Sequence, residues 1–246
     1  MIDILQDYWK ALLWTDGYHI TGLAMTLWIL IVSVSLGGML ALILAVGRNS
    51  QYRVIKLPIW LFTYIFRGTP LYVQLLIIYT GLYTLSIVKD NAWLGDFFQS
   101  GLNCTILAFT LNTCAYTTEV FAGAIRNVPQ GEIQAAIALG FNRFDLYRYI
   151  ILPRAFGIAL PAYSNEVIFM LHSTALAFTV TVQDVMKIAR DIYAETYQPF
   201  HAFSIAAVIY LCVSFTLIFA FKKLERHCLA YMRKDETEFK EKSTSK

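Results

Sequence analysis

Three charged residues interrupt long apolar stretches of this chain: Arg67, Glu119 and Glu166. A charged side chain at hydrocarbon depth is costly unless it is paired or faces a water-filled cavity. Glu166 lies about eleven residues into its stretch, near mid-membrane at the rise of an α-helix, with no basic residue close to it in the sequence. It is therefore either a protonated or hydrogen-bonded core carboxyl, or an anchor for a cationic group of a ligand.

Polar side chains recur at helical spacing around Glu166 and in an earlier apolar stretch. Glu166 and Met170 share a helix face at i, i+4 spacing, and Asn112 and Tyr116 form a second such pair. Facing pairs of this kind can line a polar cavity between helices. A lone histidine in an apolar helix more often makes a packing hydrogen bond than a ligand contact, and we expect this of His172. The candidate binding residues are Glu166, Asn165, Asn112, Tyr116, Met170, His172 and Ser173.

Arg67 and Glu119 are expected to serve structure. Arg67 stands in the segment FRGTP, where Gly68 and Pro70 break or kink a helix. The two charged residues would lie at similar depth in neighbouring spans, so we predict that they form an ion pair.

The sequence contains none of the common catalytic or metal-binding patterns. Its four cysteines lack C-x-x-C neighbours and are expected to be free thiols, and its four histidines form no HExxH motif. A phosphate-binding G-x-x-x-x-G-K-[ST] loop is missing too, so an ATP-driven process would need a separate subunit. We expect neither an enzyme nor a bound metal or cofactor.

Composition indicates a membrane protein. The chain is 57% hydrophobic and 15% charged, whereas soluble domains carry about 25% charged residues. A spanning helix needs about 20 mostly apolar residues. We predict a single all-α domain over residues 1–246 with five spans, at about 20–47, 57–85, 103–125, 155–182 and 200–221.

Basic residues gather after the first, third and fifth stretches and in the C-terminal tail. The positive-inside rule puts these segments in the cytoplasm, with the N-terminus periplasmic and the C-terminus cytoplasmic. The net charge of +3 is accounted for by this topology and implies no nucleic-acid partner. Before the first span, apolar residues at helical spacing up to Leu13 predict a helix lying on the membrane surface, with Trp9 and Trp14 at the interface.

The polar patch EIQAAIALGFNRFDLYRYIILP lies within the cytoplasmic loop 126–154 and predicts two short helices. Ala135 and Ala136 allow a partner to approach the first helix closely. Gly140 stands where a helix ends with positive φ, and Asn142 can cap the next helix. Pro153 is expected to close that second helix.

This patch resembles the EAA loop of the membrane subunits of ABC importers, with Gln134 at the position of the family's glutamate and Glu132 two residues earlier. The segments FRGTPLYVQL, AYTTEVFAGAIRNVPQGEIQAAIALG and LPAYSNEVIFMLHSTALAF resemble the polar amino-acid branch of the type I importer permeases. Within that branch the chain is most similar to the M-type membrane subunit of importers for histidine and for lysine, arginine and ornithine.

The resemblance implies the five-span type I permease fold in a bacterial inner membrane, surrounded by membrane lipid. It implies a paralogous Q-type permease subunit, a dimer of ATPase subunits that bind ATP and Mg²⁺, and a periplasmic substrate-binding protein. It also implies a non-catalytic importer subunit for basic amino acids, in which Glu166 and Asn165 hold a substrate cation. The ATPase-coupling residues would be Glu132, Gln134, Ala135, Ala136, Gly140 and Arg143.

Two alternatives stay open. The importer could carry another polar amino acid, such as glutamine. A self-sufficient secondary transporter is the other alternative, although such folds often show inverted repeats and more spans, which this sequence does not.

Overall fold

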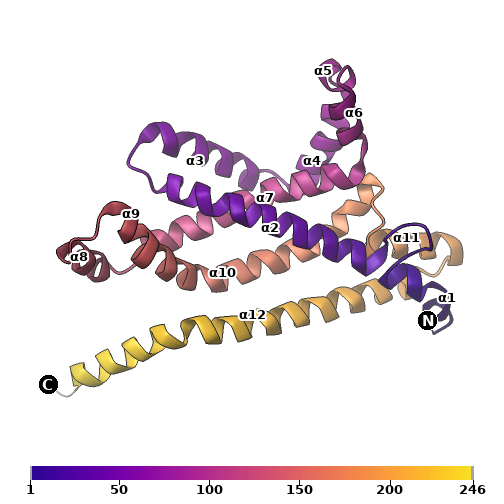
Figure 1. Cartoon of the computed structure of the whole chain (residues 1–246). Coiled ribbons are helices and arrows are strands. Elements are labelled where there is room, and N and C mark those ends of the chain that lie inside the picture. Colours follow the sequence, from indigo (N-terminus) through magenta and orange to yellow (C-terminus); the bar gives the residue numbers. More distant parts are fainter. Residues whose placement is uncertain (1, 245–246) are drawn as a thin grey trace.

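The computed structural model describes residues 2–244, and side chains from residue 5 to residue 228. The chain is built on four long helices that run lengthwise through the molecule (Figure 1): α2 (Gly22–Arg48), α7 (Gly101–Arg126), α10 (Leu152–Ser173) and α12 (Pro199–Thr244). The N-terminal helix α1 and the C-terminal half of α12 lie at opposite ends of the molecule in Figure 1.

Shorter helical segments connect and cap these four helices. They are α1 (Ile2–Leu13), α3 (Arg53–Gly68), α4 (Leu71–Leu76), the π-helix η1 (Ile77–Gly81), the 3₁₀ turn η2 (Leu82–Thr84), α5 (Ser86–Lys89), α6 (Ala92–Gln99), α8 (Gln130–Ala138), α9 (Arg143–Asp145), the π-helix η3 (Leu146–Ile151), the 3₁₀-helix η4 (Thr174–Val180) and α11 (Val185–Thr196). The prediction of an all-α fold is confirmed in the described part of the chain.

Helix α7 is the centre of the bundle and packs most extensively against α2. The two backbones approach closely at Gly37, where an added Cβ atom would lie 2.9 Å from the carbonyl oxygen of Thr110. Many of the buried residues of α7 are small or polar, among them Thr105, Thr113 and Thr117. Helix–helix interfaces in membranes favour such residues because they permit close contact.

In the described residues, α2 and the segment Pro199–Cys228 of α12 are long and apolar enough to cross a membrane as straight helices. A third candidate is the bent pair Arg53–Gly68 and Leu71–Thr84, whose axes differ by 104°. Helices α7 and α10 match the predicted spans 103–125 and 155–182 in position, but neither is among the helices that reach that apolar limit.

The predicted break at Gly68 and Pro70 is confirmed, since α3 ends at Gly68 and α4 starts after Pro70. The break frees backbone carbonyls that a continuous helix would use. The Gln74 side chain donates to the carbonyl oxygens of Phe66 at 2.8 Å and Thr69 at 3.0 Å. Asn112 on α7 adds a 3.4 Å hydrogen bond to Phe66, so these two amides stabilise the bend.

Within the loop after α7, the end of α8 and the start of α9 lie where the sequence predicts them. Gly140 has φ +82° and its N–H donates to the Ile137 carbonyl at 3.0 Å, while the Phe141 N–H donates to the Ala136 carbonyl at 3.1 Å. This pair of bonds is the Schellman motif that ends α8. The Asn142 side chain then accepts the Asp145 N–H at 2.9 Å and caps α9.

The prediction that Pro153 closes the second helix is wrong. The helical chain runs from α9 through η3 and continues into α10, with Pro153 in the first turn of α10. A proline in a continuous α-helix clashes with the carbonyl four residues earlier and lacks an N–H to donate. The preceding turn is instead wound as a π-helix, in which Leu152 N–H bonds the Tyr147 carbonyl, and this wider turn accommodates the proline.

The other end of the molecule carries α1 and α11. Leu12 of α1 is buried with Ile188 and Ile192 of α11, and the Tyr8 hydroxyl donates to the Glu195 carboxylate. Trp9 and Trp14 are 50% and 67% exposed, which agrees with the predicted position of these rings at a membrane interface.

Asp184, for which the sequence pattern predicts no role, is fully buried at the start of α11. It accepts the Lys187 N–H at 2.9 Å and the Tyr210 hydroxyl at 3.4 Å. Burial is the main cause that raises the pKa of Asp184 to about 7, and it outweighs the hydrogen bonds that favour the ionised form. Asp184 therefore holds α11 against α12 at the cost of burying a titratable group.

Candidate substrate cavity and coupling loop

A cavity of about 370 Å³ opens between the start of α4, α7 and α10. It brings together five of the seven predicted binding residues, which come from two helices far apart in the sequence: Asn112, Tyr116, Glu166, Met170 and Ser173. The remaining lining residues are Thr69, Pro70, Leu71, Thr113 and Phe169. We call this space the Glu166 cavity.

Glu166 is half-buried in this cavity. Within the described side chains, its carboxylate has no hydrogen-bond or ion-pair partner. The described residues therefore supply no hydrogen bond to a core carboxyl at this position. A half-buried carboxylate attracts a cation more strongly than one in bulk water.

Two predicted binding residues do not line the cavity, and a third is already engaged. Asn165 is exposed outside it. His172 Nε2 lies 3.0 Å from Ser214 Oγ on α12, a packing contact of the kind expected. Asn112 lines the cavity, but its side-chain nitrogen donates to Gln74 Oε1 at 3.1 Å as well as to the backbone at the bend. The role of Gln74 at the bend was not predicted, although a polar side chain in the first turn after the Pro70 break could have indicated it.

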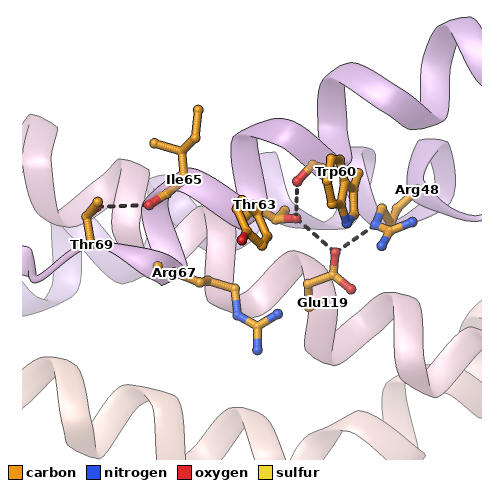
Figure 2. Close-up of a pocket in the computed structure, with 9 residues that line it drawn as sticks. Arg48, Trp60, Thr63, Ile65, Arg67, Thr69 and Glu119 are labelled. Atoms are coloured by element: carbon orange, nitrogen blue, oxygen red, sulfur yellow. Dashed lines mark hydrogen bonds and ion pairs between the residues drawn. The ribbon is translucent and has the colours of Figure 1, made fainter.

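A second cavity, of about 550 Å³, lies on the other side of the bend beneath α3 (Figure 2). We call it the Glu119 cavity, after the carboxylate at its wall. Its lining residues are Arg48, Trp60, Thr63, Tyr64, Ile65, Arg67, Gly68, Thr69 and Glu119.

The predicted Arg67–Glu119 ion pair is wrong. Glu119 Oε1 accepts Arg48 Nε at 2.7 Å and the Thr63 hydroxyl at 2.9 Å, as Figure 2 shows. Thr63 is level with Glu119, and Arg67 lies one helical turn, or about 6 Å, further along α3. The guanidinium of Arg67 instead stacks over the Tyr116 ring, 5.3 Å from its centroid.

In the loop after α7, Glu132 on α8 is bound by Arg154 in the first turn of α10. Arg154 Nε lies 2.9 Å from Oε1 and 2.8 Å from Oε2 of the carboxylate, and an N–H of the same guanidinium also contacts Oε1. This bond is the main cause that holds the pKa of Glu132 below its usual range, against the opposing effect of burial. The pair joins α8 to the helix that carries Glu166.

The other predicted coupling residues lie mostly on the surface. Gln134, Ala135, Gly140 and Arg143 are exposed, whereas Ala136 is 3% exposed and packs inward in the core of the loop. This surface also has an apolar side that was not predicted, which exposes Leu139 (79%), Phe144 (69%) and Ile137 (57%). Exposed apolar side chains of this size, rimmed by polar residues, are typical of a protein–protein contact.

Comparison with known protein families identifies the family to which this chain belongs. The profile described as "Binding-protein-dependent transport system inner membrane component" matches residues 37–228. The chain belongs to this family of ABC importer permeases. The family membership confirms the predicted resemblance to the type I importers of the polar amino-acid branch.

Individual relatives match between 82% and 96% of this permease. The histidine/lysine/arginine/ornithine transport system permease protein HisM of Escherichia coli K12 is 67% identical over 237 residues, which cover 96% of this chain and 100% of HisM. The octopine transport system permease protein OccM of Rhizobium radiobacter is 40% identical, with 87% and 88% covered. The crystal structure of an amino acid ABC transporter with histidines matches with a TM-score of 0.73 at 31% identity, covering 82% of this chain and 90% of that one.

Proposed function

We propose that this permease is the M-type membrane subunit of an ATP-driven importer of basic amino acids: histidine, arginine, lysine and ornithine. The observation that carries the proposal is the Glu166 carboxylate, which lines a cavity between helices and has no partner in the described residues. The 67% identity to a permease named for these four amino acids supports the same substrate class.

The proposed topology has five spans in a bacterial inner membrane: α2, the bent pair of α3 with Leu71–Thr84, α7, α10 with η4, and α12. The basic loops after α2 and α7 lie at the same end of the molecule as α8 and α9, and α1 lies at the other end (Figure 1). The positive-inside rule then makes the α8 end cytoplasmic and the α1 end periplasmic.

Substrate capture would use the charge of Glu166. A periplasmic binding protein would deliver the amino acid to the pathway formed by this chain and its Q-type paralogue. Glu166 would hold the α-amino or side-chain cation, with Tyr116 and Ser173 offering hydroxyl groups beside it. The bend between α3 and α4 borders the same cavity, which fits the discontinuous helices that line transport sites in other membrane proteins.

Coupling would pass through a single helix. The ATPase subunits, which bind ATP and Mg²⁺, would dock on the exposed face of α8 and on Phe144. Movement of α8 would pull on Arg154 through the ion pair with Glu132. Arg154 and Glu166 lie on α10 twelve residues apart, about 18 Å along the axis, so a shift of the loop would tilt the helix that carries the carboxylate.

The test is uptake by proteoliposomes that contain the purified chain with its paralogue, ATPase and binding protein. We expect ATP-dependent uptake of labelled arginine, lysine, histidine and ornithine, and no uptake when the ATPase is omitted. Uptake by this chain alone, driven by an ion gradient, would establish a secondary transporter. Uptake of glutamine in preference to arginine would contradict the proposed substrate class.

A further inference from the structure

Arg67 occupies the junction of the two cavities. It lines the Glu119 cavity, and the Tyr116 ring on which it stacks lines the Glu166 cavity. The Tyr116 hydroxyl also donates to the Arg67 backbone carbonyl at 3.3 Å, so ring and arginine hold each other in place. Thr69, two residues after Arg67, lines both cavities.

The charges at this junction are unevenly paired. Glu119 is satisfied by Arg48 and Thr63, which leaves Arg67 without a carboxylate partner in the described residues. Glu166 is likewise without a cationic partner there. The Tyr116 ring on which Arg67 stacks lines the Glu166 cavity, so the positive charge of Arg67 lies beside that cavity.

Resting on the proposed function, we propose that Arg67 is the resident counter-cation of the Glu166 cavity and sets its affinity for cationic substrates. In the empty cavity Arg67 supplies the positive charge that Glu166 lacks. An arriving arginine or lysine is repelled by this nearby charge and is held less tightly than it would be by an isolated carboxylate. This repulsion favours release, which an importer needs because a cation bound too tightly would block the pathway.

The size of the effect of Arg67 on ligand binding can be worked out from Coulomb's law. At an effective dielectric constant of about 20, repulsion between the Arg67 guanidinium and a ligand cation roughly 10 Å away would weaken binding roughly tenfold. Removal of the Arg67 charge should therefore tighten the binding of a cationic amino acid about tenfold. Because this repulsion acts directly between Arg67 and the ligand cation, it should persist at a similar magnitude when Glu166 is replaced by glutamine.

The experiment is equilibrium binding of labelled arginine to the assembled transporter in nanodiscs, without the binding protein. Arg67→Gln should bind arginine about tenfold more tightly than wild type, and Arg67→Lys, which keeps the charge, should stay within about threefold of wild type. In a Glu166→Gln background, where binding is weaker overall, Arg67→Gln should tighten binding by a similar factor, because the repulsion acts on the ligand itself. Unchanged or weaker binding by an assembled Arg67→Gln transporter would show that Arg67 is only a structural residue.

Arg67→His provides a test within one protein sample, independent of how well the glutamine variant assembles. Imidazole loses its charge near pH 6.5, whereas arginine as ligand stays cationic. Binding to Arg67→His should tighten up to about tenfold between pH 5.5 and 7.5, beyond any change in wild type or in Arg53→His, an exposed control at the start of α3. An equal pH response in all three would overturn the inference. A wild-type transporter that binds none of the basic amino acids would overturn the proposed function, and this inference with it.

Discussion

Replacement of Arg48 by methionine removes the cation that Glu119 contacts at 2.7 Å. Both side chains of this pair are largely buried, with 14% and 15% of their surface exposed. Removal of one partner from a buried pair costs about 3–5 kcal/mol, because the remaining charge is left uncompensated. We expect the low end, about 3 kcal/mol, for Arg48→Met, since the Thr63 hydroxyl still donates to Glu119 at 2.9 Å.

Glu119→Gln should cost less, about 1–2 kcal/mol, because an amide oxygen still accepts from Arg48 and Thr63. The double variant should be more stable than the sum of the two single effects, by about 1 kcal/mol or more. For a chain of this size 1 kcal/mol corresponds to about 2–4 °C in Tm, so Arg48→Met should lower Tm by about 6–12 °C.

The assay is thermal unfolding of the purified chain in detergent, followed by intrinsic fluorescence, with Arg67→Met as the matched control. Arg67 makes no ion pair in the described residues, so its loss should lower Tm by less than Arg48→Met does. Strict additivity of Arg48→Met and Glu119→Gln, or a larger effect of Arg67→Met, would refute the assignment of Arg48 as the partner of Glu119.

Three further predictions concern the two ends of the molecule. Gly140→Val should leave insertion intact but weaken ATPase co-purification and transport several-fold, because a β-branched residue is strained at φ +82°; normal values of both would contradict it. Protonation of Glu132, whose pKa is lowered in the folded chain, removes its contribution to stability as pH falls, so wild type should lose more stability than Glu132→Gln between pH 5 and pH 3.5; parallel melting curves would contradict this. Asp184 lies just outside the proposed spans and has its pKa raised from 3.8 to about 7, so the folded chain holds its proton more tightly and stability should fall as pH rises from about 4 to 7; Asp184→Asn should flatten that fall, and an unchanged slope would argue against a buried carboxyl.

Local signals in the sequence were enough to predict parts of both sites. Gly140 and Asn142 act on their own backbone, so the end of α8 and the start of α9 follow from residue type. The break near Gly68 and Pro70 is local in the same way. The i, i+4 spacing of Glu166 and Met170 fixes a shared helix face whatever the rest of the fold does, and both residues line the cavity.

The failures concern contacts between helices and adjustments of backbone geometry. The partner of Glu119 depends on how α2, α3 and α7 pack, and depth along one straight helix does not determine that packing. Pro153 was expected to end a helix because the π-turn that absorbs it has no sequence signature as clear as proline itself. Asp184 escaped notice because only the tertiary fold makes it buried.

The central claim is that the Glu166 carboxylate binds the cation of a basic amino acid during import. Its most direct test is a comparison of uptake and ATPase activity in reconstituted complexes that carry Glu166→Gln. Asp90→Asn, an exposed carboxylate-to-amide change after α5, serves as the matched control. The account predicts normal assembly and largely preserved ATPase stimulation by the loaded binding protein, with uptake of arginine and lysine reduced at least tenfold and the control unchanged. Wild-type uptake by a well-assembled Glu166→Gln complex would contradict the account and remove Glu166 from the substrate site.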